Sequence, residues 1–135
     1  MSGPGQRHGV VAVVVREGRF LVIRRSEQVV APGAFCFPGG GIEPGETEEA
    51  ALVRELREEL DLLVRPIRLV WRSVTPWNVS LAWWLSEFEG QPTCNPAEVA
   101  SLHWHTADEL AALPKLLESN HHFLAAVRSG EIVLE

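Results

Sequence analysis

The chain has 135 residues, of which 46% are hydrophobic and 22% are charged, a balance that fits one folded domain and excludes a disordered chain. It has no apolar run long enough to span a bilayer, and its two cysteines form no disulfide framework or zinc-ligand pattern, so a cytoplasmic location without membrane contact is expected. The formal net charge of −6, with no run of Lys or Arg, disfavours binding to a nucleic-acid polymer, whereas a small anionic ligand remains compatible.

The N-terminal segment at residues 1–8 is polar and contains glycine and proline. It lacks the basic and then apolar order of a signal peptide. We expect this segment to be flexible and residues 9–135 to form a single domain.

Apolar runs bounded by turn-forming residues predict six strands. They lie at residues 9–15, 19–25, 35–37, 65–75, 79–88 and 102–105. The first two are expected to pair as a hairpin, whereas the glycines of residues 38–41 disfavour a strand interior. Helices are predicted at residues 47–61, 107–113 and 120–128. This order predicts an α/β fold in which helices flank a mixed β-sheet.

The helix predicted from Thr47 gathers acidic side chains on one face. At about 100° per residue, Glu55, Glu58 and Glu59 share this face. A neighbouring leucine stripe can seat the helix on the sheet, and it consists of Leu52, Leu56, Leu60 and Leu63. A divalent cation such as Mg²⁺ or Mn²⁺ would turn the repulsion between the acids into coordination. A solvated acidic face is the alternative, but the preceding glycine-rich segment, which lets the backbone approach a metal or an anion, favours the cation.

Residues 40–62, GGIEPGETEEAALVRELREELDL, resemble the Nudix box. The box pattern is met by Gly40, Glu46, Arg54, Glu55, Leu56, Glu58, Glu59 and Leu62. One position departs from it, because Asp61 stands where the family has glycine, and we expect this to perturb only the helix end, since Asp can adopt the left-handed conformation. Residues 37–40 and 102–110 are also similar to family segments. The resemblance implies a Nudix-type α/β/α sandwich.

The resemblance also implies roles for the residues of the box. Glu55, Glu58 and Glu59 would bind the divalent metal together with the carbonyl of Gly39. Arg54 would orient a neighbouring glutamate by a charge-assisted hydrogen bond. Glu46 would serve as a secondary metal ligand or would support the ligands without binding the metal. The metal would neutralise a diphosphate and activate water, and a glutamate would remove the proton as water attacks one phosphorus.

Four residues outside the box are candidates by position. Glu98 lies six residues before Trp104, a spacing similar to that of MutT-like members, in which such a loop acid reaches the metal; it competes with a box glutamate for the role of general base. Arg25, at the end of a predicted strand, is a candidate phosphate contact, or else a solvated charge. Asn120 is a candidate reader of a base edge, or else a helix N-cap. Trp77, in a predicted turn, is a candidate stacking residue.

These observations predict a divalent-metal-dependent enzyme, with Mg²⁺ as the cofactor and Mn²⁺ as a substitute. The reaction expected is hydrolysis of a diphosphate bond in a small nucleotide, with a nucleoside triphosphate preferred, as in a MutT-like pyrophosphohydrolase. The alternatives are an ADP-ribose, nucleotide-sugar or dinucleotide pyrophosphatase and a non-catalytic nucleotide-binding module. The sequence leaves the oligomeric state open, a homodimer included.

Overall fold

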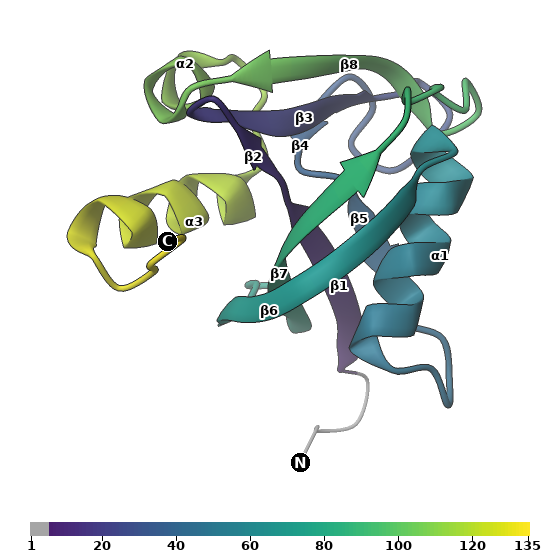
Figure 1. The fold of residues 1–135 in the computed structure, drawn as a ribbon, viewed down its shortest axis with the longest axis horizontal. Helices are drawn as coiled ribbons and strands as arrows, with labels where there is room; N and C mark the ends of the chain where they lie inside the picture. The colour runs from purple at the N-terminus through teal and green to yellow at the C-terminus, as the bar shows by residue number, and fades with distance from the viewer. Residues whose placement is uncertain (1–5) are drawn as a thin grey trace.

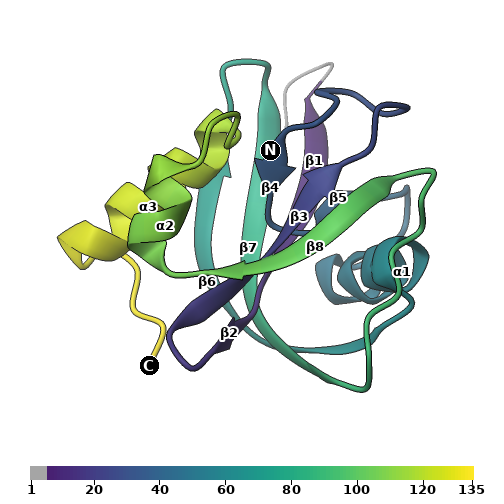
Figure 2. The same cartoon turned by 90° about the horizontal axis from the view of Figure 1, so that it is seen from above.

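The computed structural model describes residues 6–135, which form two β-sheets between helices (Figures 1 and 2). The strands are β1 (Arg7–Val13), β2 (Val15–Arg16), β3 (Arg19–Arg25), β4 (Phe35–Cys36), β5 (Gly39–Gly41), β6 (Leu63–Val74), β7 (Val79–Glu89) and β8 (Val99–His105). The helices are α1 (Glu48–Leu60), α2 (Ala107–Ala112) and α3 (Glu118–Ser129). Helix α1 lies on one side of the sheets and α2 and α3 lie on the other (Figure 1). The structure therefore has the expected α/β/α arrangement.

The first sheet is mixed, as predicted. Its strands follow the order β5-β1-β7-β6, in which β1 and β7 are parallel and the other pairs are antiparallel. In the second sheet, β3 pairs with β2, β4 and β8, all antiparallel. Strand β1 already includes Arg7 and His8, so part of the segment expected to be flexible is a strand, and residues 1–5 lie outside the described residues.

The predicted hairpin between the first two strands is mostly wrong. Strand β1 pairs with β5 and β7, and only the two residues of β2 pair with β3. The turn itself forms where predicted, with positive φ at both Glu17 and Gly18, as a two-residue hairpin loop needs. The chain crosses from one sheet to the other at Val14, between β1 and β2.

The glycine-rich segment expected to be irregular contains a strand, β5, antiparallel to β1. A Cβ atom added at Gly39 would lie 2.1 Å from the carbonyl oxygen of Val10. Glycine is therefore required at this position because the two backbones approach too closely for any side chain. The close approach brings the β5 backbone toward α1.

The side chains of strand β1 point alternately into two apolar cores. Val10 and Ala12 pack in the core that contains the α1 leucines, whereas Val11 and Val13 pack in the core that contains Phe123 of α3. Successive side chains of a strand point to opposite faces, so a continuous apolar run serves both cores at once. The sheets are thus held from both sides.

Helix α1 forms as predicted. Thr47 is its N-cap and accepts a hydrogen bond from the backbone N–H of Ala50 at 3.1 Å. Asp61 ends it in the left-handed conformation, with φ 52° and ψ 38°, which confirms that aspartate can replace glycine there. The reversal of the chain at this cap places Leu62 in the core and leaves Leu63 69% exposed, so Leu63 was wrongly assigned to the buried stripe.

The C-terminal helices cover the face of the sheets opposite to α1. Helix α3 begins at Glu118, so Asn120 lies in its first turn, and Leu117 occupies the N-cap position. Asn120 is therefore not the N-cap that the alternative interpretation required. Within residues 6–135, no helix is long and apolar enough to cross a membrane.

Candidate functional site

Glu59 is the most deeply buried carboxylate of the helix. Glu59 is only 7% exposed, and its Oε1 accepts a hydrogen bond from the backbone N–H of Gly39 at 3.0 Å. Burial raises the pKa of Glu59 to about 8, and the nearby carboxylate of Glu55 adds to the rise, while the Gly39 hydrogen bond opposes it. A carboxylate in this setting would be stabilised by a cation.

Glu55 lies one helical turn earlier, directly against the glycine strand. A Cβ atom at Gly40 would come within 2.3 Å of the Glu55 carboxyl carbon, so any side chain at this position would displace the Glu55 carboxylate. Burial raises the pKa of Glu55, against the opposing effect of a hydrogen bond from Arg54 Nη1 to Glu55 Oε1 at 3.0 Å. Helix α1 and strand β5 therefore place Glu55 and Glu59 side by side against the backbone of Gly39 and Gly40.

Arg54 lies beside this cluster and is held in place by several hydrogen bonds. Its Nε and Nη2 donate to the two carboxylate oxygens of Glu46 at 2.8 and 2.9 Å, and Nη2 also donates to the carbonyl of Gly41 at 2.8 Å. This bidentate pairing lowers the pKa of Glu46 to about 2 and raises the pKa of Arg54 further above its usual range. Glu46 thus acts on Arg54, in agreement with a supporting role and not with that of a direct ligand. Glu58 lies 3.5 Å from Arg54 Nη1 and its side chain is 48% exposed.

Glu98 comes from the loop between β7 and β8, which runs past α1 (Figure 2). After burial and stronger electrostatic effects, its carboxylate also contributes to the raised pKa of Glu55 and of Glu59, so its charge is close enough to be felt at both. Its Oε2 is buried and has no hydrogen-bond partner among residues 6–135. A buried, unpartnered carboxylate oxygen is costly unless a ligand satisfies it, so this atom and its two acidic neighbours fit a hard divalent cation. Within residues 6–135, no group of three or more His, Cys, Asp or Glu side chains is already arranged to hold a metal. Binding would therefore draw the carboxylates together.

A cavity of about 330 Å³ adjoins the carboxylate cluster. Residues from β1, β3, β5 and α3 line it, among them Arg25, Gly39, Gly40 and Asn120. Arg25 Nε donates to the carbonyl of Val30 at 2.6 Å, and its charge opposes, as the smallest of the effects, the raised pKa of Glu59. The structure therefore brings Arg25 and Asn120 to the same cavity as the box residues.

Asn120 is buried, and its side chain is already engaged in part. Its Oδ1 accepts from the backbone N–H of Phe37 at 3.0 Å, and its Nδ2 donates to Ser119 Oγ at 3.3 Å. The amide oxygen is thus held by the β4–β5 connection, and a donor hydrogen of Nδ2 remains for a ligand. Phe37 itself is a core residue, packed on Phe20 and Phe123.

Trp77 does not line the cavity that contains Arg25 and Asn120. It lies on the turn between β6 and β7, is 69% exposed, and borders a separate small hollow. Ser119 lines both spaces, so the two are neighbours. The structure gives no support to stacking by Trp77 inside the cavity that contains Arg25 and Asn120.

Sequence reasoning missed three polar residues of the cavity, namely Arg7, His8 and Ser119. Arg7 and His8 lie at the start of β1, before its apolar run, where no periodic signal marks a strand. Ser119 reaches the cavity only through the docking of α3, which no local pattern reveals.

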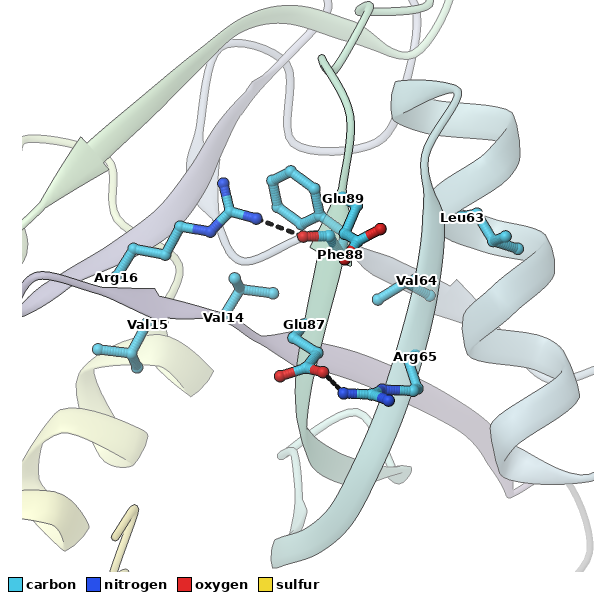
Figure 3. A pocket seen from close by; sticks show the side chains of 9 residues that line it. All are labelled: Val14, Val15, Arg16, Leu63, Val64, Arg65, Glu87, Phe88 and Glu89. Atoms are coloured by element: carbon cyan, nitrogen blue, oxygen red, sulfur yellow. Dashed lines mark hydrogen bonds and ion pairs between the residues drawn. The ribbon is translucent and has the colours of Figure 1, made fainter.

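The larger cavity of the molecule, about 550 Å³, lies elsewhere, between β2 and the ends of β6 and β7 (Figure 3). Both arginines that line it have partners within the protein. Arg65 pairs with Glu87, and Arg16 donates to the carbonyl of Phe88 and stacks 4.0 Å above the Phe88 ring. Size alone therefore does not identify the functional site, whereas buried and unpartnered charge does.

The comparisons with known proteins agree with this geometry. A family model described as the NUDIX domain matches residues 5–127. The chain is 35% identical over 109 residues to the CTP pyrophosphohydrolase of Escherichia coli strain K12, covering 78% of this chain and 79% of that protein. It is 38% identical over 76 residues to the nucleoside triphosphatase NudI of Escherichia fergusonii, covering 56% of this chain and only 50% of that protein. The crystal structure of a MutT NUDIX hydrolase from Burkholderia pseudomallei superimposes with a TM-score of 0.71 at 28% identity, covering 89% of this chain and 96% of that one.

The chain belongs to the Nudix hydrolase family. The family, the α/β fold and the enzyme class inferred from residues 40–62 are thereby confirmed. Members of this family generally need a divalent metal.

Proposed function

We propose that this protein is a cytoplasmic, MutT-like pyrophosphohydrolase that hydrolyses a diphosphate bond of a nucleoside triphosphate with Mg²⁺, for which Mn²⁺ can substitute. The observation that carries the proposal is the buried, unpartnered Oε2 of Glu98 beside Glu55 and Glu59. An acidic protein binds an acidic nucleotide well only if cations stand between them, and this cluster offers a place for them.

The box residues would hold the cation from one side and Glu98 from the other. A bound divalent cation supplies Lewis-acid chemistry, neutralising phosphate charge and favouring attack by water. Glu55, Glu58, Glu59 and Glu98 supply the carboxylate oxygens, and Gly39 lies within reach of the same centre through its backbone. Arg54 and Glu46 keep the helix face fixed against the Gly41 carbonyl.

The proton of the attacking water needs an acceptor. Glu59, which is buried, and Glu55, which is partly buried, are carboxylates of raised pKa, which suits a group that must take up a proton near neutral pH. Glu98 is the competing acceptor. Replacing each in turn by glutamine and recording the rate against pH distinguishes them, since only loss of the acceptor removes the acidic limb of the profile.

Arg25 and Asn120 would bind the substrate in the adjoining cavity. Arg25 offers a guanidinium for a phosphate oxygen, and the Nδ2 of Asn120 offers a donor for an acceptor atom of the base. The related CTP pyrophosphohydrolase and nucleoside triphosphatase support a nucleoside triphosphate as the substrate class. The negative net charge supports a small nucleotide and not a nucleic-acid polymer.

The test is a turnover screen of the purified protein with Mg²⁺ or Mn²⁺. Canonical and oxidised nucleoside triphosphates, ADP-ribose, nucleotide sugars, NADH, CoA and dinucleotides are compared by product analysis. We expect a nucleoside monophosphate and pyrophosphate from a triphosphate, with no turnover in EDTA. Preference for ADP-ribose or a dinucleotide would refute the substrate class, and nucleotide binding without turnover would indicate a non-catalytic module.

Glu55→Gln tests the site directly, and Glu49→Gln is its matched control. Both residues lie on α1, but Glu49 is in the exposed first turn, away from the cluster. We expect Glu55→Gln to lower kcat by at least about 100-fold, the range of a lost acid–base or metal-binding group, and Glu49→Gln to leave it unchanged. Equal activity in the two variants would refute the assignment.

A further inference from the structure

The loop at residues 90–98, between β7 and β8, is attached to the end of helix α1. Asn95 donates from Nδ2 to the carbonyl of Glu58 at 3.2 Å and from its backbone N–H to the carbonyl of Glu59 at 2.9 Å. The backbone N–H of Thr93 donates to the carbonyl of Leu60 at 2.8 Å. The last carbonyls of a helix have no partner within the helix, so the loop satisfies them and is held in register with the helix.

A second attachment joins the same loop to the end of strand β3. Ser26 follows Arg25 directly, and its buried hydroxyl donates to the carbonyl of Ala97 at 2.9 Å. The backbone N–H of Ser26 donates to the carbonyl of Glu98 at 3.0 Å. The Ser26 hydroxyl also accepts from the N–H of Gln28 at 3.2 Å, which fixes the orientation of its proton toward Ala97.

Glu98 lies where these two attachments meet. Its N–H donates to the carbonyl of Asn95 at 2.9 Å, and its own carbonyl is held by Ser26. The carboxylate Oε2, in contrast, has no hydrogen-bond partner among residues 6–135. The position of this carboxylate beside Glu55 and Glu59 therefore depends on the backbone attachments of the loop and not on bonds of its own oxygen.

We propose that Ser26 is a positioning residue, whose hydroxyl, by holding the Ala97 carbonyl, keeps the Glu98 carboxylate at the divalent-cation centre. Asn95 supplies the complementary attachment to the helix that carries the other ligands. The inference rests on the proposed function in that it assumes a cation between Glu98 and α1. It adds a buried side-chain link between the end of β3 and the loop that carries the cation ligand.

The first test measures the affinity for Mn²⁺ alone, by electron paramagnetic resonance, without nucleotide. We expect Ser26→Ala and Glu98→Gln each to weaken Mn²⁺ binding by about tenfold, the lower end of the effect of residues that orient metal ligands. In the double variant the second substitution should add less than about twofold, because both act through one carboxylate. Full additivity, or an unchanged Mn²⁺ affinity in Ser26→Ala, would overturn the proposal.

The second test uses the initial rate with the best nucleoside triphosphate. Ser26→Ala should lower kcat by about tenfold and leave KM within about twofold, because the cation ligand moves while the substrate cavity keeps its shape. Ser86→Ala is the matched control, since Ser86 is also a buried serine whose hydroxyl donates to a backbone carbonyl, that of Trp84 at 3.0 Å. Equal losses in the two variants would show that Ser26 acts only through stability.

Ser26→Cys keeps the test open if Ser26→Ala does not fold. The thiol keeps a polar hydrogen but is larger than the hydroxyl and a weaker donor, so an intermediate Mn²⁺ affinity is expected, and an affinity equal to the wild type would contradict the proposal. The two proposals fail separately. Mn²⁺ affinity that depends on Ser26 and Glu98 without any turnover refutes the proposed function alone, whereas turnover that responds equally to Ser26→Ala and Ser86→Ala refutes the positioning role alone.

Discussion

Two regions of this protein contain charged side chains in opposite electrostatic states, namely the larger cavity at the start of β6 and the end of β7 and the carboxylate cluster beside the smaller cavity. In the larger cavity, at the ends of β6 and β7, each Arg has a partner within the protein, Glu87 for Arg65 and the Phe88 carbonyl and ring for Arg16. In the smaller cavity and the cluster beside it, Glu98 has an unpartnered buried oxygen and Glu59 has a strongly raised pKa. The first arrangement is complete without a ligand, whereas the second costs stability until something cationic is bound.

The difference shows why charge balance separates the sites better than volume. A surface ion pair contributes little and can be lost at little cost. A desolvated carboxylate next to other carboxylates is retained only where the protein gains something from it, as in a metal centre. The following substitutions test this contrast, from the largest expected effect to the smallest.

The largest effect should be the pH dependence that Glu59 gives to the metal-free protein. Its folded-state pKa, about 8, lies above the ordinary value of 4.5, so the folded state holds this proton more tightly than the unfolded chain. Stability from this group is therefore complete below about pH 4.5 and is lost as the pH rises toward 8, by on the order of 5 kcal/mol. Urea unfolding in EDTA at pH 5, 6.5 and 8.5 measures it. Glu59→Gln should flatten the decline, and an unchanged slope would contradict the assignment.

Gly40→Ala should reduce activity by about 100-fold. The new methyl carbon would lie 2.3 Å from the Glu55 carboxyl carbon and displace that carboxylate, and a misplacement of about 1 Å at a reacting centre has an effect of this size. The control is Gly41→Ala in the same strand, where a Cβ atom meets nothing within 4 Å and the backbone carbonyl is unchanged. Initial rates of the two variants are compared. Similar rates would show that the contact between Gly40 and Glu55 is not needed for turnover.

Arg16→Met in the larger cavity should lower the free energy of unfolding by about 1 kcal/mol, through loss of its contact with the Phe88 ring and its hydrogen bond to the Phe88 carbonyl. Activity should not change, since no ligand is expected there. Urea unfolding and initial rates measure both. Loss of activity at full stability would mean that the larger cavity takes part in function after all.

Glu87→Gln should have the smallest effect, within about 0.5 kcal/mol of the wild-type free energy of unfolding, because its ion pair with Arg65 is largely exposed. Thermal unfolding at low and at high salt should give nearly the same difference between the two proteins. A loss as large as the effect expected from Glu59 ionisation would remove the contrast between the cavities.

The local features of the site could be predicted from the sequence. Thr47, Asp61 and the spacing of Glu55, Glu58 and Glu59 depend on helix geometry alone, and the structure has them as expected. The error at Leu63 came from the same rule applied one residue beyond the helix end, where the left-handed Asp61 changes the direction of the chain.

The pairing of distant segments could not be predicted in this way. Apolar alternation identified β1 and β3 but not the separate sheets to which they belong, because both sheets offer buried faces to the same pattern. Strand β5 was not predicted because glycine has a low strand propensity. The strand forms by pairing with β1, whose backbone approaches Gly39 too closely for a side chain.

The sequence by itself determined the family, through the motif at residues 40–62, and the helix with its acidic face, through periodicity and capping within one segment. Only the tertiary structure decided that Glu98 lies near Glu55 and Glu59 and that the Asn120 side chain is hydrogen-bonded to Phe37. It also decided that Trp77 lies outside the cavity lined by Arg25 and Asn120. The physical reason is that contacts across the fold are selected by the burial of the whole core, whose free energy is shared by segments far apart in the chain.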